Sequence, residues 1–182
     1  MPYKTSADRY GSVAIALHWL TAALIAAAIL VIWSFGYAEP HTPLKTDLLI
    51  IHRSLGLTVL AVAIVRLAWR VIHGAPPLDL GLPAWQRLIA LVTHWAFYLL
   101  FFVQPITGYL STAADNHEVS YFMLFDVPQM VPYDHALAEA MDGVHSALQW
   151  VIYTLIVLHT GAALAHHYLF KDGTLRRMLP SA

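Results

Sequence analysis

The stretch GVHSALQWVIYTLIVLHTGAALAHHYLF, residues 143–170, decides the fold of this chain. It contains no Asp, Glu, Lys or Arg, and it exceeds the roughly 20 apolar residues that cross a bilayer as a helix. His145 and His159 lie 14 residues apart within it. At about 3.6 residues per turn the second imidazole returns to nearly the face of the first, about 21 Å further along the axis. One helix can therefore serve two separate cofactors at two depths.

The composition indicates a membrane protein. Hydrophobic residues make up 59% of the 182 positions and charged residues 12%, and the mean hydropathy is +0.60, which excludes an ordinary soluble domain. Residues 10–38 and 88–114 are also free of charge, and Pro40 and Pro43 disfavour helix after the first of these stretches. The alternating pattern of a membrane barrel is absent. We therefore predict an all-α membrane protein, a four-transmembrane-helix bundle in which residues 1–182 form a single domain, with helices at about 12–36, 48–72, 85–112 and 137–170.

The charges of the loops predict the orientation, because basic residues mark the cytoplasmic side. The segment between the third and fourth helices carries six acidic residues and no Lys or Arg, and the link between the first two helices carries only Lys45 as a base. Basic residues instead gather before the first helix, around the second link and after the last helix: Lys4, Arg9, Arg66, Arg70, Arg87, Lys171, Arg176 and Arg177. We expect a multi-pass protein of the bacterial inner membrane, surrounded by lipid, with both termini in the cytoplasm.

The balance of charge and the absence of cysteine exclude several classes of function. The formal net charge is −1, so no basic surface suggests nucleic acid as a partner. The chain has no cysteine, which excludes disulfides, iron–sulfur clusters and thiolate metal sites. Any redox cofactor must therefore be held by other side chains.

Four histidines fall at two depths of this topology. His18 and His159 lie on the cytoplasmic side, and we call them the inner pair. His52 and His145 lie near the outer ends of their helices, and we call them the outer pair. Ionisable residues inside a membrane are costly and mark functional sites, although a neutral histidine can also hydrogen-bond a neighbouring helix.

Small residues follow three of these histidines by one helical turn, which leaves room for a flat macrocycle. They are Ala22, Gly56 and Ala163, whereas Gln149 follows His145 and breaks the pattern. Small residues are also common where membrane helices pack against one another. The depth pairing favours two b-type haems, one for each pair, which would pass electrons and leave no position for oxygen. Neutral imidazoles also bind zinc or nickel, so a non-redox metal transporter remains an alternative, although isolated pairs without carboxylates make poor divalent sites.

Several motifs resemble those of the bacterial cytochrome b561 family. The most specific is HTGAALAHHYLFKDGTLRRMLP, residues 159–180, and four shorter motifs fall at matching places: LHWL (17–20), IHRSLG (51–56), HWAFYLL (94–100) and PITG (105–108). The resemblance covers nearly the whole chain. It implies a four-helix cytochrome with two haem b groups, whose axial ligands are His18 with His159 and His52 with His145.

The resemblance also implies a function in electron transfer. Members of this family move electrons between a quinone, here ubiquinone, and a second redox partner, and some members oxidise superoxide while reducing ubiquinone. The alternative is a haem-bearing membrane anchor subunit of a dehydrogenase or hydrogenase. The chain is therefore expected to be an oxidoreductase, and no residue is assigned a catalytic role.

Five further residues are candidate binding residues, and each also has a simpler structural explanation. His166 could hydrogen-bond a haem propionate or a quinone carbonyl, or face lipid headgroups. His94 could serve a quinone or a proton path, or pack between helices. Arg53 could pair with an outer haem propionate or attract superoxide, or extend to the headgroups. Arg66 and Arg70 could neutralise inner propionates, or simply obey the positive-inside rule.

Overall fold

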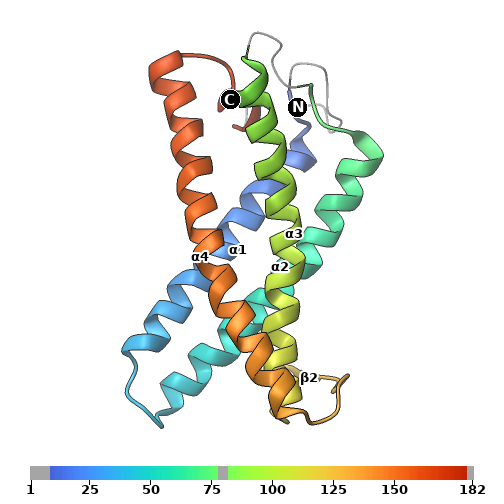
Figure 1. The fold of residues 1–182 in the computed structure, drawn as a ribbon, viewed down its shortest axis with the longest axis vertical. Helices are drawn as coiled ribbons and strands as arrows, with labels where there is room; N and C mark the ends of the chain where they lie inside the picture. Colours follow the sequence, from blue (N-terminus) through green and yellow to red (C-terminus); the bar gives the residue numbers. More distant parts are fainter. Residues whose placement is uncertain (1–8, 78–81, 180–182) are drawn as a thin grey trace.

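The computed structural model describes residues 9–77 and 82–179, so Lys4 and Pro180 of the sequence argument lie outside the described residues. Four long helices follow one another, α1 (Ser12–Tyr37), α2 (Pro43–His73), α3 (Ala84–Ala114) and α4 (His135–Ala165), as Figure 1 shows. Helices make up 76% of these described residues. The predicted all-α membrane fold with four spanning helices is therefore confirmed.

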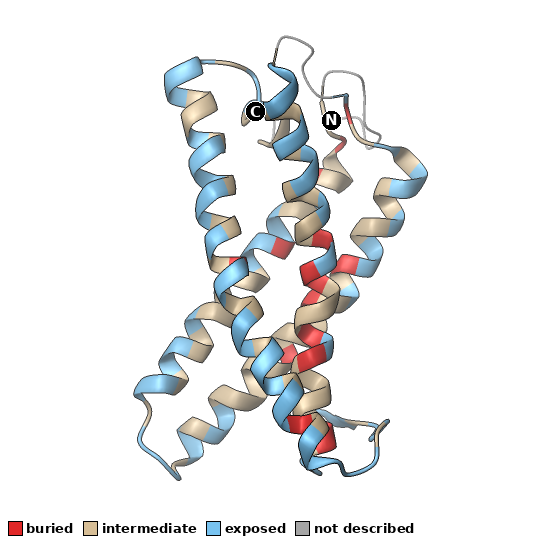
Figure 2. Cartoon of the chain, in the orientation of Figure 1, coloured by how far each residue is buried: buried red, intermediate tan, exposed pale blue. Residues whose placement is uncertain are grey.

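All four helices are long and apolar enough to cross a membrane. Helix α1 has 26 residues and the other three have 31 each. At about 1.5 Å per residue these lengths exceed the roughly 30 Å of a bilayer's hydrocarbon core. Few of their residues are buried, and the buried positions gather along α3 and in the middle of the bundle (Figure 2). A bilayer is the environment that suits such an exposed apolar surface.

Pro43 was expected to disfavour helix, but it forms the first residue of one. Pro43 begins α2, about five residues before the expected start near residue 48. A proline is tolerated at the first helical position because its missing N–H would have no partner within the helix. Thr42 caps this end, since its Oγ1 accepts a hydrogen bond from the Lys45 backbone N–H at 3.4 Å. The loop between the two helices is correspondingly short.

Helices that follow one another in the chain pack together, but the last helix does not close the bundle against the first two. Helix α1 packs along α2, α2 along α3 and α3 along α4, whereas the backbone of α4 does not pack along α1 or α2. Side chains of α4 that point toward α1 and α2 therefore lie across a wider separation than close helix packing gives. All four histidines of the inner and outer pairs lie on these three helices.

The connection between α3 and α4 contains a small β-hairpin that the sequence did not predict. Strands β1 (Val119–Tyr121) and β2 (Phe125–Val127) pair antiparallel. The fully buried Ser54 of α2 fixes the hairpin to the bundle: its Oγ accepts a hydrogen bond from the Phe122 N–H at 2.8 Å. We call the end of the bundle that carries this hairpin the hairpin end.

After α4 the chain changes its helical geometry. Residues His166–Phe170 form a π-helical turn (η1), and Lys171 follows with a left-handed backbone (φ 56°). A short 3-10 helix (η2, Arg176–Met178) comes next. Near this end the Arg9 guanidinium donates a hydrogen bond to the Leu179 carbonyl oxygen. The two ends of the described chain therefore meet at the opposite end of the bundle from the hairpin, as Figure 1 shows.

Candidate functional site

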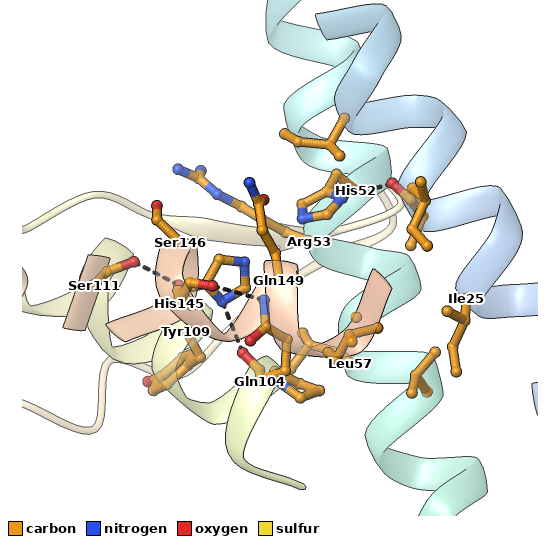
Figure 3. A pocket seen from close by; sticks show the side chains of 18 of the residues that line it. Ile25, His52, Arg53, Leu57, Gln104, Tyr109, Ser111, His145, Ser146 and Gln149 are labelled. Carbon is orange, nitrogen blue, oxygen red and sulfur yellow. Dashed lines mark hydrogen bonds between the residues drawn. The ribbon is translucent and has the colours of Figure 1, made fainter. Parts of the chain in front are cut away.

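The outer pair brings one imidazole from α2 and one from α4 together. The ring centroids of His52 and His145 are 6.3 Å apart, and the ring planes are perpendicular. Figure 3 shows both rings at the same cavity. A metal ion lies about 2.0 Å from an imidazole nitrogen, and that nitrogen lies about 1.2 Å from its ring centre, so two rings on opposite sides of one ion would have centroids about 6.4 Å apart. The observed separation fits a metal held between the two imidazoles.

The second nitrogen of each outer ring is fixed by a backbone carbonyl. His52 Nδ1 lies 3.0 Å from the Ala28 carbonyl oxygen of α1, and His145 Nδ1 lies 2.9 Å from the Gln104 carbonyl oxygen of α3. A carbonyl oxygen only accepts, so both Nδ1 atoms carry a hydrogen and both Nε2 atoms keep a free lone pair. Metal-binding histidines are usually oriented in this way. The outer pair is therefore prepared to bind a metal through Nε2.

A cavity of about 300 Å³ adjoins the outer pair. Its walls come from all four helices and from the hairpin residue Val119. Arg53 and Gly56, both singled out in the sequence, line it, and a Cβ added at Gly56 would meet no atom within 4 Å. The cavity is mostly apolar with a few convergent polar groups, which is the usual character of a cofactor site.

The inner pair has the same spacing. The ring centroids of His18, on α1, and His159, on α4, are 6.3 Å apart with an interplanar angle of 62°. His94 of α3 also belongs to this cluster, because its ring centroid lies 5.7 Å from that of His159. The ring of Phe97 lies 5.4 Å from His159 and covers it from the side. The separation of the inner pair therefore also fits a metal ion, with His94 as a neighbouring third imidazole.

The inner pair differs from the outer pair at the second nitrogen of His18. Arg66 Nη2 lies 3.0 Å from His18 Nδ1, and a guanidinium only donates, so this Nδ1 is an acceptor. A metal ion on Nε2 would require the hydrogen on Nδ1 instead, and Arg66 would then have to donate elsewhere. Among residues 9–77 and 82–179, Arg66 has no carboxylate partner within 4 Å. An anionic group of a cofactor would suit the released guanidinium.

A second arginine lies beside Arg66. The Arg70 guanidinium lies 5.8 Å from the ring centroids of Trp95 and Tyr98, and that of Arg66 lies 5.6 Å from the Tyr98 ring. These contacts place both cations against aromatic faces of α3, where cation–π attraction stabilises them. Arg70 therefore lies near Arg66, which contacts His18 of the inner pair.

His166 lies in η1, beyond α4, and is bound to an acidic residue. Its Nδ1 donates a hydrogen bond of 2.5 Å to the Asp172 carboxylate. Partial burial would raise the pKa of Asp172, but hydrogen bonds from the Thr174 N–H and from His166 outweigh it and lower the pKa. This pairing could not be predicted from the sequence, because the π-turn that brings residues 166 and 172 together has no simple sequence signature.

Three residues of α3 that contact His145 were not predicted as site residues from the sequence. Gln104 contacts it through both its backbone and its side chain, Thr107 through its hydroxyl at 3.4 Å from Nδ1, and Gly108 through its backbone beside the ring. Gly108 belongs to the PITG motif that supported the family resemblance, but the motif alone assigned it no role. Only the packing of α3 on α4 shows which histidine these residues face.

Comparison with known proteins gives one family for the chain. The family model described as prokaryotic cytochrome b561 matches residues 9–181. Cytochrome b561 homolog 2 of Escherichia coli K12 is 36% identical over 98% of this chain and 95% of its own length. The protein named probable superoxide oxidase CybB of Yersinia pestis is 30% identical over 94% of this chain and 96% of its own. Cytochrome b561 homolog 1 of E. coli K12 is 28% identical over 95% and 98%.

Proposed function

The chain belongs to the prokaryotic cytochrome b561 family, as its motifs indicated, and from this premise we propose that it carries electrons through two b-type haems. Family membership makes it a multi-pass bacterial membrane cytochrome and implies haem b. The number of haems and their ligands are our proposal. The observation that carries it is the pair of imidazole separations, 6.3 Å in both cases, at two depths of one bundle.

The proposed ligands are His18 with His159 and His52 with His145. Haem b held by two imidazoles exchanges one electron and leaves no coordination position open. Ala28 and the backbone of Gln104 hold the outer rings in the tautomer that binds a metal. Arg66 and Arg70 supply positive charge beside the inner pair, and Arg53 supplies it at the outer cavity. These cations suit the carboxylates that a b-type haem carries.

We propose ubiquinone as one electron partner and place both termini in the cytoplasm. The orientation rests on the basic residues of the loops. The end with the hairpin then faces outward, together with the outer pair. In favour of superoxide as the second partner, one relative is named a probable superoxide oxidase. Two superoxide anions would each lose one electron and leave as dioxygen, while one ubiquinone gains two electrons and two protons.

Stopped-flow mixing tests this choice of donor. The oxidised protein is mixed anaerobically with a superoxide pulse, and the b-type absorption is followed with and without a soluble ubiquinone. Superoxide as donor predicts fast reduction of the absorption band, followed by reoxidation when the quinone is present. Reduction no faster than in the presence of superoxide dismutase would exclude superoxide as the donor and leave the di-haem proposal standing.

Histidine substitutions test the proposed ligands. His145→Ala and His159→Ala remove imidazoles from the same helix at two depths. Each should leave a protein with one haem per chain. In electron paramagnetic resonance (EPR), His145→Ala should keep only the low-spin signal of the inner haem, and His159→Ala only that of the outer haem. His167→Ala, which removes a histidine of η1 beyond α4, is the control and should keep two haems. Retention of both haems in either ligand variant would contradict the assignment.

A further inference from the structure

Helix α3 supplies no ligand in the proposed arrangement, yet it contacts the outer ligand His145 in four ways, one of which is the Thr107 hydroxyl 3.4 Å from His145 Nδ1. The Gln104 carbonyl oxygen accepts from His145 Nδ1 at 2.9 Å. The Gln104 side-chain Nε2 donates to the His145 carbonyl oxygen at 3.0 Å. Gly108, one turn further along, passes directly beside the imidazole. A single turn of α3 therefore contacts both the ring and the backbone of this histidine.

Gly108 is the residue that leaves room for the ring. A Cβ built at this position would lie 2.9 Å from His145 Cε1 and 3.0 Å from its Nδ1. Carbon atoms do not approach a ring this closely, so even alanine would push the imidazole aside or separate the helices. This explains the break in the pattern of small residues within α4. The small residue beside His145 lies on the neighbouring helix instead of one turn along its own, where Gln149 stands.

The amide of Gln104 has a fixed orientation. The His145 carbonyl oxygen can only accept, so Nε2 must face it and Oε1 must point away. This Oε1 is buried and has no hydrogen-bond partner among the described residues, and Gln104 lines the outer cavity. Leaving a buried acceptor unpaired is unfavourable. The side chain nevertheless keeps its hydrogen bond to α4 at the ligand itself, which indicates a role in holding that backbone.

We propose that residues 104–108 of α3 are the positioning element of the outer ligand, with Gln104 and Gly108 as positioning residues. The Gln104 carbonyl keeps the hydrogen on Nδ1 of His145, the Gln104 amide holds the helix at the ligand, and Gly108 admits the ring. The inference rests on the proposed function, because it takes His145 to be a haem ligand. It predicts that α3, without touching the metal, sets how firmly and in what orientation the outer haem is held.

Gly108→Ala tests the steric part, with Gly143→Ala as the matched control. Gly143 stands on α4 two residues before His145, and a Cβ there would meet no atom within 4 Å. Changes to residues that orient a metal ligand weaken metal binding by about 10- to 100-fold. We expect Gly108→Ala to lose the outer haem that much more readily to apomyoglobin, while the inner haem is retained. Gly143→Ala should match the wild type.

Gln104→Leu tests the hydrogen bond with a smaller change in shape. We expect both haems to be retained, and the low-spin EPR signal and midpoint potential of the outer haem to shift while those of the inner haem stay in place. A purely structural role would lower stability without moving one haem's signals alone. This variant decides the question if Gly108→Ala does not fold.

His145→Ala, measured in the same series, separates two kinds of failure. If His145→Ala keeps both haems, the ligand assignment is wrong. If it loses the outer haem, but Gly108→Ala and Gln104→Leu both match Gly143→Ala in haem transfer, EPR and potential, then only the positioning role of α3 is overturned.

Discussion

Replacing Ser54 with alanine should release the hairpin from the bundle. Ser54 is fully buried, and its Oγ is the acceptor for the Phe122 N–H at 2.8 Å. The same Oγ lies 2.7 Å from the Ile50 carbonyl oxygen, but that carbonyl is within α2 and keeps its helical partner. The Ser120 carbonyl oxygen also loses its contact with this Oγ at 3.3 Å. The main loss is one partly buried N–H without an acceptor, which costs about 1–3 kcal/mol.

This cost corresponds to faster hydrogen exchange at the hairpin. If the Phe122 amide exchanges through local release of the hairpin, about 1–3 kcal/mol gives a rate about 5- to 150-fold higher. The assay is hydrogen exchange followed by mass spectrometry on peptides that cover residues 119–127, with the protein in lipid nanodiscs. Because Val119 lines the outer cavity, the same variant should also admit more water to the outer pair.

Ser34→Ala is the matched control for this prediction. Ser34 is exposed, and its Oγ donates to the Leu30 carbonyl oxygen one turn back in α1, at 2.9 Å. Its replacement should leave exchange of residues 119–127 unchanged. If Ser54→Ala exchanges at the wild-type rate in this segment, the hydrogen bond does not hold the hairpin and the reasoning is refuted.

Two further changes test the charges at the other end of the bundle. Arg66→Gln removes a cation that would stabilise the reduced form of the proposed inner haem. For charges about 7 Å apart at an effective dielectric constant near 20 the loss is roughly 2 kcal/mol, so the midpoint potential of that haem should fall by about 90 mV. An equal fall for the outer haem in a redox titration would contradict this. Asp172→Asn removes a carboxyl whose pKa is lowered in the folded protein. The wild type should therefore have a higher free energy of unfolding than the variant above the ordinary pKa of about 4, and this difference should disappear as the pH falls below it. Thermal unfolding from pH 7 to pH 3 measures the difference, and a difference that does not vary with pH would argue against the role of this carboxyl.

The sequence allowed the spanning helices to be predicted because each is a long apolar run with a clear end. It also predicted the pairing of the four histidines. The loop charges predict which end of each helix faces the cytoplasm, and the position of each histidine within its helix then gives its depth. Residues 166 and 172 could not be paired in this way, because their contact depends on a π-turn. Nor could Pro43 be placed as the start of a helix from its tendency to break one, since the same residue favours the first turn.

The outer site shows most clearly what a single sequence leaves out. The ligand candidates were accessible because each histidine is an exceptional residue in an apolar segment. Gln104 and Gly108 are ordinary residues of a membrane helix, and their importance arises from the approach of α3 to α4. The hairpin is similar: Ser54 lies two residues after His52, but its partner Phe122 is 68 positions away in the chain.

The most direct test of the central claim is the number of haems bound to each chain. The protein is purified in lipid nanodiscs after expression with excess haem, and haem b is measured by the pyridine haemochromogen assay against protein from amino-acid analysis. The arrangement of two imidazole pairs predicts two haems per chain, both low-spin in EPR. A fully loaded, correctly folded protein with one haem per chain or none would contradict it.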